Sequence, residues 1–113
     1  MTLATQRLSA DIAVVGQLDP AAMAEAAAAG FRSVVNNRPD FEGGPAQPTS
    51  ASIEAAARAA GLAYAFLPVA PNLQTAEDIA RFAALIAELP KPILAFCRTG
   101  TRSGKLVRAA TGG

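Results

Sequence analysis

The chain has 113 residues, 51% of them hydrophobic, and carries ten Lys and Arg, nine Asp and Glu, one cysteine and no histidine. This length predicts a single domain over residues 1–113, and the lack of histidine excludes Ser-His-Asp triads, Cys-His pairs and imidazole metal ligands. One cysteine excludes an intrachain disulfide and a cysteine-based zinc site, so we expect no metal and no cofactor, and catalysis would need Cys97, a lysine or a carboxylate.

Two short apolar pieces near the N-terminus, Leu8 and Ile12–Val15, are predicted to be edge strands. A helix should follow them, because Asp19 is a suitable N-cap and Pro20 suits the first helical position. Gly30 can supply the left-handed stop that ends this helix.

The middle of the chain is predicted to continue with a strand, a loop, a helix and a second strand. The stretch 31–37 has the apolar character of a buried strand, and the polar stretch 37–49 is rich in Pro and Gly, as loops are. An alanine-rich helix should run from residue 49 or 50 to residue 60, and the next strand is expected over 62–69.

The C-terminal part is predicted to hold a helix, a short strand and a last helix. Thr75 can cap the first of these helices together with Asp78 three residues later, and Pro90 ends it. The stretch 92–96 is a short apolar strand, and the last helix is expected over about 103–110.

This alternation of strands and helices predicts a small three-layer α/β domain, in which a parallel sheet with right-handed crossovers has helices on both faces. In such sheets ligands bind beyond the carboxyl ends of the strands. The loops 37–49, 69–75 and 97–103 should therefore gather at one edge, and Cys97 lies in the loop between the last strand and its helix.

The near-neutral charge is unevenly distributed along the chain. Residues 1–88 carry five basic and nine acidic side chains, whereas residues 89–113 carry five basic side chains and no acid. Such a segment is either a solvated basic face or a site for a small anion, and both interpretations remain open on charge alone. The segment is too short and too poor in aromatic residues to predict a nucleic-acid partner.

The N-terminus lacks the pattern of a secretory signal, and no apolar run approaches the length of a membrane span. A free cysteine without a partner suits a reducing compartment. We therefore expect a cytoplasmic protein that has no membrane partner.

The segment 93–106 carries the residues with the clearest chemical use. An apolar strand leads to Cys97, four residues intervene, and Arg102 and Ser103 then open a helix. Backbone N–H groups of the four residues between can converge on an anion, and Gly100 allows the positive φ that such a turn needs. These four residues are predicted to bind the substrate: Arg98, Thr99, Gly100 and Thr101.

Cys97, Arg102 and Ser103 are predicted to be catalytic. The helix N-terminus and the nearby guanidinium groups would lower the pKa of the Cys97 thiol, and the Ser103 hydroxyl could donate to its sulfur. Arg102 could hold an oxyanion through two parallel hydrogen bonds. The alternative is that Cys97 is an inert core residue, as a lone cysteine after an apolar strand often is.

The sequence Cys-Arg-Thr-Gly-Thr-Arg over residues 97–102 resembles the active loop of rhodaneses, the thiosulfate sulfurtransferases. The segments IAVVGQLDP, AGFRSVVNNRPD and LAYAFLPV resemble the opening of a dual-specificity phosphatase. Together they resemble the bacterial beta-lactamase-hydrolase-like family, whose domain is phosphatase-like. The resemblance implies a fold of the cysteine-phosphatase type, and it also implies a persulfide dioxygenase as a partner, since some members are fused to one.

Two departures from the phosphatase pattern affect the expected activity. Those enzymes have His-Cys-x5-Arg, but here Phe96 precedes Cys97 and the spacing to Arg102 is one residue shorter. Their general acid lies in a loop that corresponds to residues 68–72, where this chain has no carboxylate, and Asp78 is expected to cap a helix. Loss of a general acid typically costs a factor of about 10²–10⁴ in rate.

We therefore expect a cysteine-dependent sulfurtransferase that takes sulfur from thiosulfate or a persulfide, forms a Cys97 persulfide and passes the sulfur to a thiol acceptor. This scheme needs no histidine and no protonated leaving group. One alternative is a phosphatase that uses the same Cys97 and Arg102, with a phosphate ester as substrate. Another is a non-catalytic module that binds anions or phosphoproteins.

Other candidates lie outside this segment. Arg38 could support the bound anion and Asp40 could orient an arginine, or these residues serve only the turn that follows a strand. Glu42 is a weaker candidate than either. Tyr64 and Phe66 alternate along a strand and are expected in the core.

Overall fold

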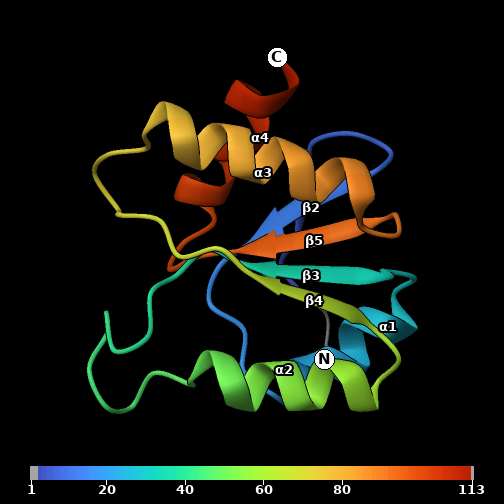
Figure 1. Cartoon of the computed structure of the whole chain (residues 1–113). Helices are drawn as coiled ribbons and strands as arrows, with labels where there is room; N and C mark the ends of the chain where they lie inside the picture. Colours follow the sequence, from blue (N-terminus) through green and yellow to red (C-terminus); the bar gives the residue numbers. More distant parts are fainter. Residues whose placement is uncertain (1–2, 113) are drawn as a thin grey trace.

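A five-stranded sheet is the centre of the computed structural model, which describes residues 3–112 (Figure 1). Its strands are β1 (Gln6–Arg7), β2 (Ile12–Val15), β3 (Ser33–Asn36), β4 (Ala63–Phe66) and β5 (Ile93–Phe96). The strand order is β1-β2-β5-β3-β4; the last four in this order are mutually parallel, and β1 pairs antiparallel with β2. The chain is thus a mostly parallel α/β domain, as the sequence predicts.

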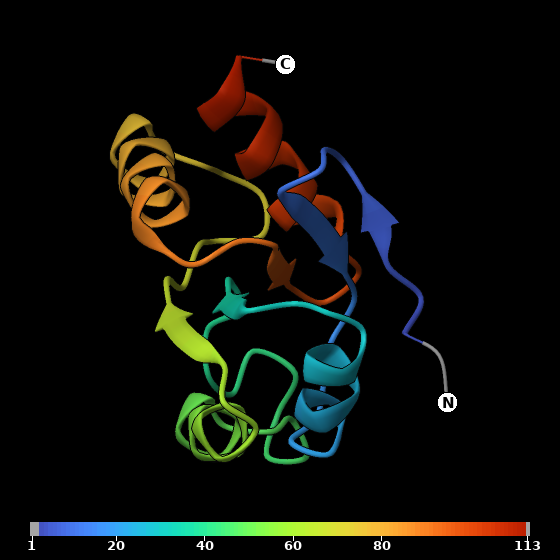
Figure 2. The same cartoon turned by 90° about the vertical axis from the view of Figure 1, so that its right-hand side faces the viewer.

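Four helices cover the two faces of the sheet. They are α1 (Ala22–Ala28), α2 (Ser50–Ala59), α3 (Ala76–Glu88) and α4 (Thr101–Thr111). In Figure 2, α3 and α4 lie above the sheet and α1 and α2 lie below it. This arrangement confirms the predicted three layers. No helix within residues 3–112 combines the length and hydrophobicity needed to cross a bilayer.

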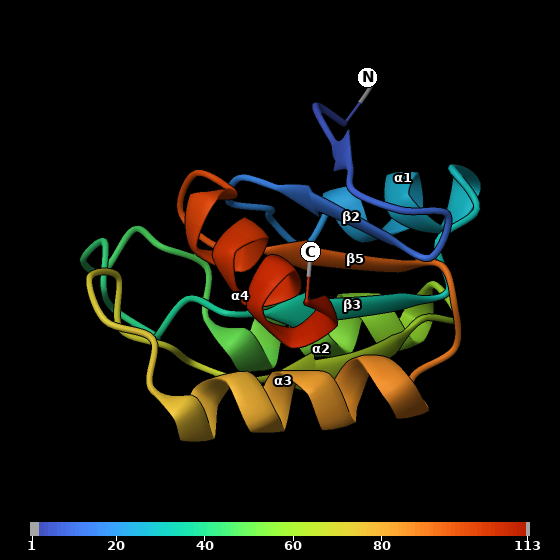
Figure 3. The same cartoon turned by 90° about the horizontal axis from the view of Figure 1, so that it is seen from above.

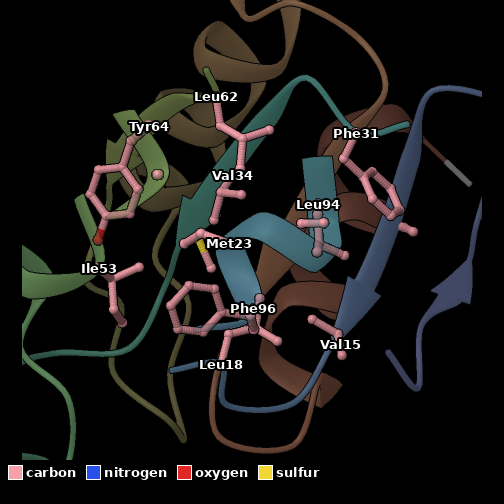
Figure 4. Packing of buried hydrophobic residues seen from close by; sticks show 14 residues of the cluster. Val15, Leu18, Met23, Phe31, Val34, Ile53, Leu62, Tyr64, Leu94 and Phe96 are labelled. Atoms are coloured by element: carbon pink, nitrogen blue, oxygen red, sulfur yellow. The ribbon is translucent and has the colours of Figure 1, made fainter. Parts of the chain in front are cut away.

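Alternate residues of the strands point to opposite faces of the sheet and belong to two separate hydrophobic cores. In β2, Ala13 and Val15 pack with α1 and α2, whereas Ile12 and Val14 pack with α3 and α4. Phe96 ends β5 in the first core, where it is fully buried close to Leu18 and Met23 (Figure 4). The residue before Cys97 therefore anchors the end of the strand that leads into loop 97–100, which we call the active loop.

Two helix ends follow the predicted signals, and the starts of α1 and α4 differ from them. Thr75 and Asp78 form a reciprocal capping box at the start of α3, and Gly30 takes the left-handed conformation after α1. Asp19 accepts a hydrogen bond from the backbone N–H of Ala22, but the N-cap of α1 is Ala21, so the helix begins two residues after Pro20, its predicted first position. The last helix begins two residues earlier than expected, because Gly100 has φ +91° and the chain becomes helical immediately after it.

Three details of the strands differ from the predictions. Leu8 belongs to the turn between β1 and β2, where its N–H bonds to the carbonyl of Ile12, so Gln6–Arg7 forms the edge strand instead. The stretch Ile12–Val15 is an inner strand, between β1 and β5. Phe66 is 39% exposed, because it ends the edge strand β4; Tyr64 is buried as expected.

Truncating Phe96 to Ala should destabilise the protein strongly, because it leaves a cavity in the first core. A fully buried phenylalanine typically contributes about 3–5 kcal/mol in such a substitution. Urea unfolding followed by circular dichroism measures the loss, and Phe66→Ala is the matched control because that ring is partly in solvent. Equal losses in the two variants would contradict the assignment of Phe96 to the core.

Candidate active site

The loops that follow β3, β4 and β5 gather beyond the carboxyl ends of these strands, on the left in Figures 1 and 3. Parallel pairing places Asn36 beside both Phe66 and Phe96, so the three loops leave the sheet at the same level. They surround a pocket of about 660 Å³. It is lined by Arg38, Glu42, Gly43, Pro71, Cys97, Arg98, Thr99, Thr101, Arg102 and Lys105.

Cys97 is one of the lining residues and is only 1% exposed. The backbone N–H of Gly100 donates to its sulfur at 3.1 Å. Burial would raise the pKa of the Cys97 thiol, but hydrogen bonds from the backbone and hydroxyl of Ser103 and from the N–H groups of Thr99 and Gly100 outweigh it, so the pKa is lowered. The lowering comes from these uncharged donors and not from the guanidinium groups that the sequence suggested.

Glycines on both sides let the active loop rest directly on the end of β2. A Cβ at Gly100, whose φ is +91°, would lie 3.3 Å from the carbonyl carbon of Val15. A Cβ at Gly16 would lie 3.2 Å from the Arg98 carbonyl oxygen, which accepts the N–H of Gln17 at 3.1 Å. Both contacts are tighter than a Cβ normally makes, so a side chain at either position would push the loop and the end of β2 apart.

Arg102 is buried in the first turn of α4 and is held by the loop that follows β3. Its Nη1 and Nη2 donate to the two carboxylate oxygens of Glu42 at 3.1 and 2.9 Å, and Nη1 also donates to the Val69 carbonyl at 2.9 Å. Its Nε has no acceptor within residues 3–112. Glu42 thus binds the two Nη atoms of the guanidinium, and the Nε–H remains free to donate to another group.

Glu42 lies between two arginines. Besides Arg102, Arg38 donates from Nε to Glu42 Oε1 at 2.9 Å, and its Nη1 donates to Gln17 at 3.0 Å. Burial would raise the pKa of Glu42, but the hydrogen bonds and positive charges of Arg102 and Arg38 lower it below its ordinary value. The carboxylate is therefore held in its charged form, and the cluster keeps one net positive charge at the pocket.

The loop 37–49 is tied to itself and to α2. Gln47 accepts the N–H of Gly43 at 2.7 Å and donates to the Pro39 carbonyl at 2.9 Å. Asp40 accepts the N–H of Ser50 at 2.7 Å. A Cβ at Gly43 would lie 2.6 Å from Nη2 of Arg38, so glycine is needed there for Arg38 to keep its place.

The structure brings most of the predicted site residues together. Arg98, Thr99 and Thr101 are exposed at the pocket, whereas Arg38 and Arg102 are buried in its wall. The prediction that Asp40 orients an arginine is wrong, because its carboxylate is engaged by the start of α2. That role belongs to Glu42, which lies two residues further along the same loop.

Ser103 is also placed differently from the prediction. Its hydroxyl contributes to the lowered pKa of Cys97, but the hydrogen bond that it donates in the structure goes to Oδ1 of Asn37, at 2.8 Å. Sequence reasoning assigned no role to Asn37, and it also missed Gln17, Gly43 and Lys105. A signal for Asn37 existed, since an amide side chain directly after an apolar strand needs polar partners once it is buried.

The chain matches the family model of the beta-lactamase hydrolase-like protein, phosphatase-like domain, over residues 5–112. It belongs to this family. Two relatives named beta-lactamase hydrolase-like protein support the assignment. The protein from Agrobacterium fabrum is 38% identical over 86% of the chain, and the one from Xylella fastidiosa is 41% identical over 81%.

The matched part of the chain covers only 22% of the length of the Agrobacterium protein and 21% of that of the Xylella protein. Among solved structures, a candidate phosphatase from Neisseria meningitidis superposes with a TM-score of 0.83 and 32% identity. That match covers 89% of this chain and 71% of the other. These findings confirm the family resemblance and support the prediction of a cysteine-dependent enzyme of this type.

Replacing Glu42 by Gln should remove a pH-dependent part of the stability. Because the arginines lower the pKa of Glu42 in the folded protein, its ion pairs stabilise the fold above the ordinary value of 4.5, and this contribution is lost as the pH falls through the lower folded-state value. Urea titrations of wild type and Glu42→Gln should differ at neutral pH and converge in acid.

The matched control is Glu54→Gln, which breaks an exposed pair with Arg58 that contributes little. A difference between wild type and Glu42→Gln that stays constant over the whole acid range would contradict the assigned role of the Glu42 charge.

Proposed function

We propose that the domain is a cysteine-dependent phosphatase that acts on small phosphate monoesters with Cys97 as its nucleophile. The observation that carries the proposal is the set of hydrogen-bond donors around the Cys97 sulfur, which favours a thiolate in a positively charged pocket. Membership of a phosphatase-like domain family supports the same function. The free cysteine suits the cytoplasm, where thiols stay reduced.

In the first step the Cys97 thiolate attacks the phosphorus atom of the ester. A phosphorus–sulfur bond forms, and the phosphorus–oxygen bond to the leaving group breaks. The backbone N–H groups of the active loop and the unpartnered Nε–H of Arg102 would bind the non-bridging oxygens, where negative charge develops. Glu42 keeps the guanidinium in place during this step.

In the second step a water molecule attacks the phosphorus atom of the cysteinyl phosphate. A new phosphorus–oxygen bond forms, inorganic phosphate and a proton leave, and the sulfur departs as a thiolate. The donors that lower the pKa of Cys97 also make it a better leaving group, because they stabilise the same anion in both steps.

The acid–base groups at the pocket restrict the range of esters. Glu42 is the only acid among the residues that line it, and two arginines hold it ionised. It is therefore a poor proton donor to a departing alkoxide. Aryl phosphates release a weakly basic phenolate that needs little protonation, and we infer that they react faster than alkyl phosphates.

The same observation makes sulfur transfer the second candidate. Cys97 would attack the outer sulfur of thiosulfate, which forms a new sulfur–sulfur bond and releases sulfite without any proton donor. The resulting persulfide would then pass its outer sulfur to an acceptor thiol or to cyanide. The short spacing between Cys97 and Arg102 supports this candidate, and a persulfide dioxygenase would be a fitting partner.

Parallel assays separate the two candidates. An aryl phosphate and an alkyl phosphate should both release phosphate, the aryl ester faster by a factor of about 10² or more, and Cys97→Ser should abolish both reactions. Thiosulfate with cyanide is the competing assay. Cys97-dependent formation of thiocyanate without phosphate release would replace the first candidate with the second.

Arg102→Lys is the informative second variant, because lysine keeps the charge but cannot contact Glu42 and an oxyanion through one planar group. We expect its phosphatase activity to fall by about 10²-fold or more with little change in fold. If neither assay shows activity above Cys97→Ser, both proposals fail, and retained binding of inorganic phosphate would leave a module that binds anions without catalysis.

A further inference from the structure

Asn37 lies directly after β3 and is completely buried, with every polar group engaged. Its N–H donates to the Phe96 carbonyl at 2.9 Å, and its own carbonyl accepts the N–H of Val69 at 3.1 Å. In the side chain, Nδ2 donates to the Leu67 carbonyl at 3.1 Å. Because that carbonyl can only accept, the amide orientation is fixed, and Oδ1 must face the Ser103 hydroxyl.

The Ser103 hydroxyl has one proton, which it donates to Asn37 Oδ1 at 2.8 Å. The same hydroxyl is among the groups that lower the pKa of Cys97, so the sulfur is the second acceptor for this proton. Both Ser103 and Asn37 are fully buried, so their side chains exchange no hydrogen bond with solvent. The proton therefore serves either the amide oxygen or the sulfur, and it changes partner by rotation of the hydroxyl alone.

We infer that Asn37 is a positioning residue that holds the Ser103 proton away from Cys97 whenever the sulfur is uncharged. In the thiol and in a covalent intermediate, the sulfur is a weak acceptor and the hydroxyl bonds to Asn37. When the sulfur becomes a thiolate, its negative charge makes it the stronger acceptor. The Ser103 hydroxyl then rotates to donate to the sulfur, and Asn37 Oδ1 is left without a hydrogen bond. This inference rests on Cys97 being the nucleophile of the proposed function.

The consequence is that the Ser103 hydroxyl stabilises the Cys97 thiolate only in part. Without a competing acceptor, the hydroxyl would donate to the thiolate at no cost, and the sulfur would become more acidic but less nucleophilic. With Asn37 present, the hydroxyl must first break its hydrogen bond to the Asn37 amide oxygen, and the cost of breaking it offsets part of the free energy gained at the thiolate. Asn37 thus keeps the pKa of Cys97 higher than the other donors around the sulfur would set it.

The test compares the Cys97 pKa in wild type, Asn37→Leu, Ser103→Ala and the double variant. The rate of alkylation by iodoacetamide over a pH series reports the thiolate directly and needs no turnover. Asn37→Leu should lower the pKa by about one unit, and Ser103→Ala should raise it by a similar amount. The double variant should match Ser103→Ala, because Asn37 acts only through that hydroxyl.

The charged groups that line the pocket stay the same in all these variants: Arg38, Glu42, Arg98, Arg102 and Lys105. Ser50→Ala is the matched control, since it removes another buried hydroxyl, one that bonds to Tyr64 at 2.7 Å away from the sulfur. It should leave the pKa of Cys97 unchanged. Asn37→Val carries the same expectation as Asn37→Leu should the leucine variant fail to fold.

Two outcomes would overturn the inference. One is a folded Asn37→Leu or Asn37→Val protein whose Cys97 pKa is equal to or higher than that of wild type. The other is a lowering that persists when Ser103 is alanine, which would mean that Asn37 acts by another route. Alkylation measures the thiol and not the reaction, so an inactive protein with the expected pKa pattern would refute the proposed function alone.

Discussion

The contact between Arg102 and Glu42 joins two parts of the chain on which the rest of the pocket depends. Arg102 belongs to the first turn of α4, and Glu42 to the loop after β3. A guanidinium buried at this position would be costly without a counter-charge, because the protein interior solvates it poorly. Glu42 supplies that charge on one edge of the group, so the arginine can be both buried and available to an anion.

Charge and hydrogen bonding have separate tasks in this pocket. The sulfur is stabilised by neutral donors from the active loop and from Ser103, which act over short distances and keep their strength in salt. The exposed Arg98 and Lys105 lie at the mouth instead, where they can attract anions from solution. The basic segment therefore contains a cysteine whose lowered pKa comes from neutral hydrogen-bond donors and not from the basic side chains around it.

The parts of the site that were predicted from the sequence are those determined by neighbours in the chain. Cys97, Gly100 and Arg102 lie within six residues, and the turn they form follows from the types of residue present. Arg102 and Glu42 are 60 positions apart, and Ser103 and Asn37 are 66 apart, so these partners are defined only by the folded sheet. The layers and helix ends were predictable for the same local reason, through periodicity and capping residues.

The errors have equally specific causes. Asp40 and Glu42 are both acids in one loop, and which of them meets an arginine depends on how the turn is closed. The N–H of Ser50 captures Asp40, and the turn through Gly43 directs Glu42 toward the pocket. Phe66 was assigned to the core because alternation along a strand does not reveal that the strand lies at an edge.

The hydrogen bonds that hold loop 37–49 in place affect how the pocket binds a ligand. Gln47 braces this loop from inside, and Asp40 fastens it to α2, so Arg38 and Glu42 already hold their positions in the free protein. Little conformational entropy then remains to be lost when an anion arrives. The rim of the pocket works as a rigid template rather than a closing flap, and selectivity among anions should depend on how well their shape fits a preformed cavity.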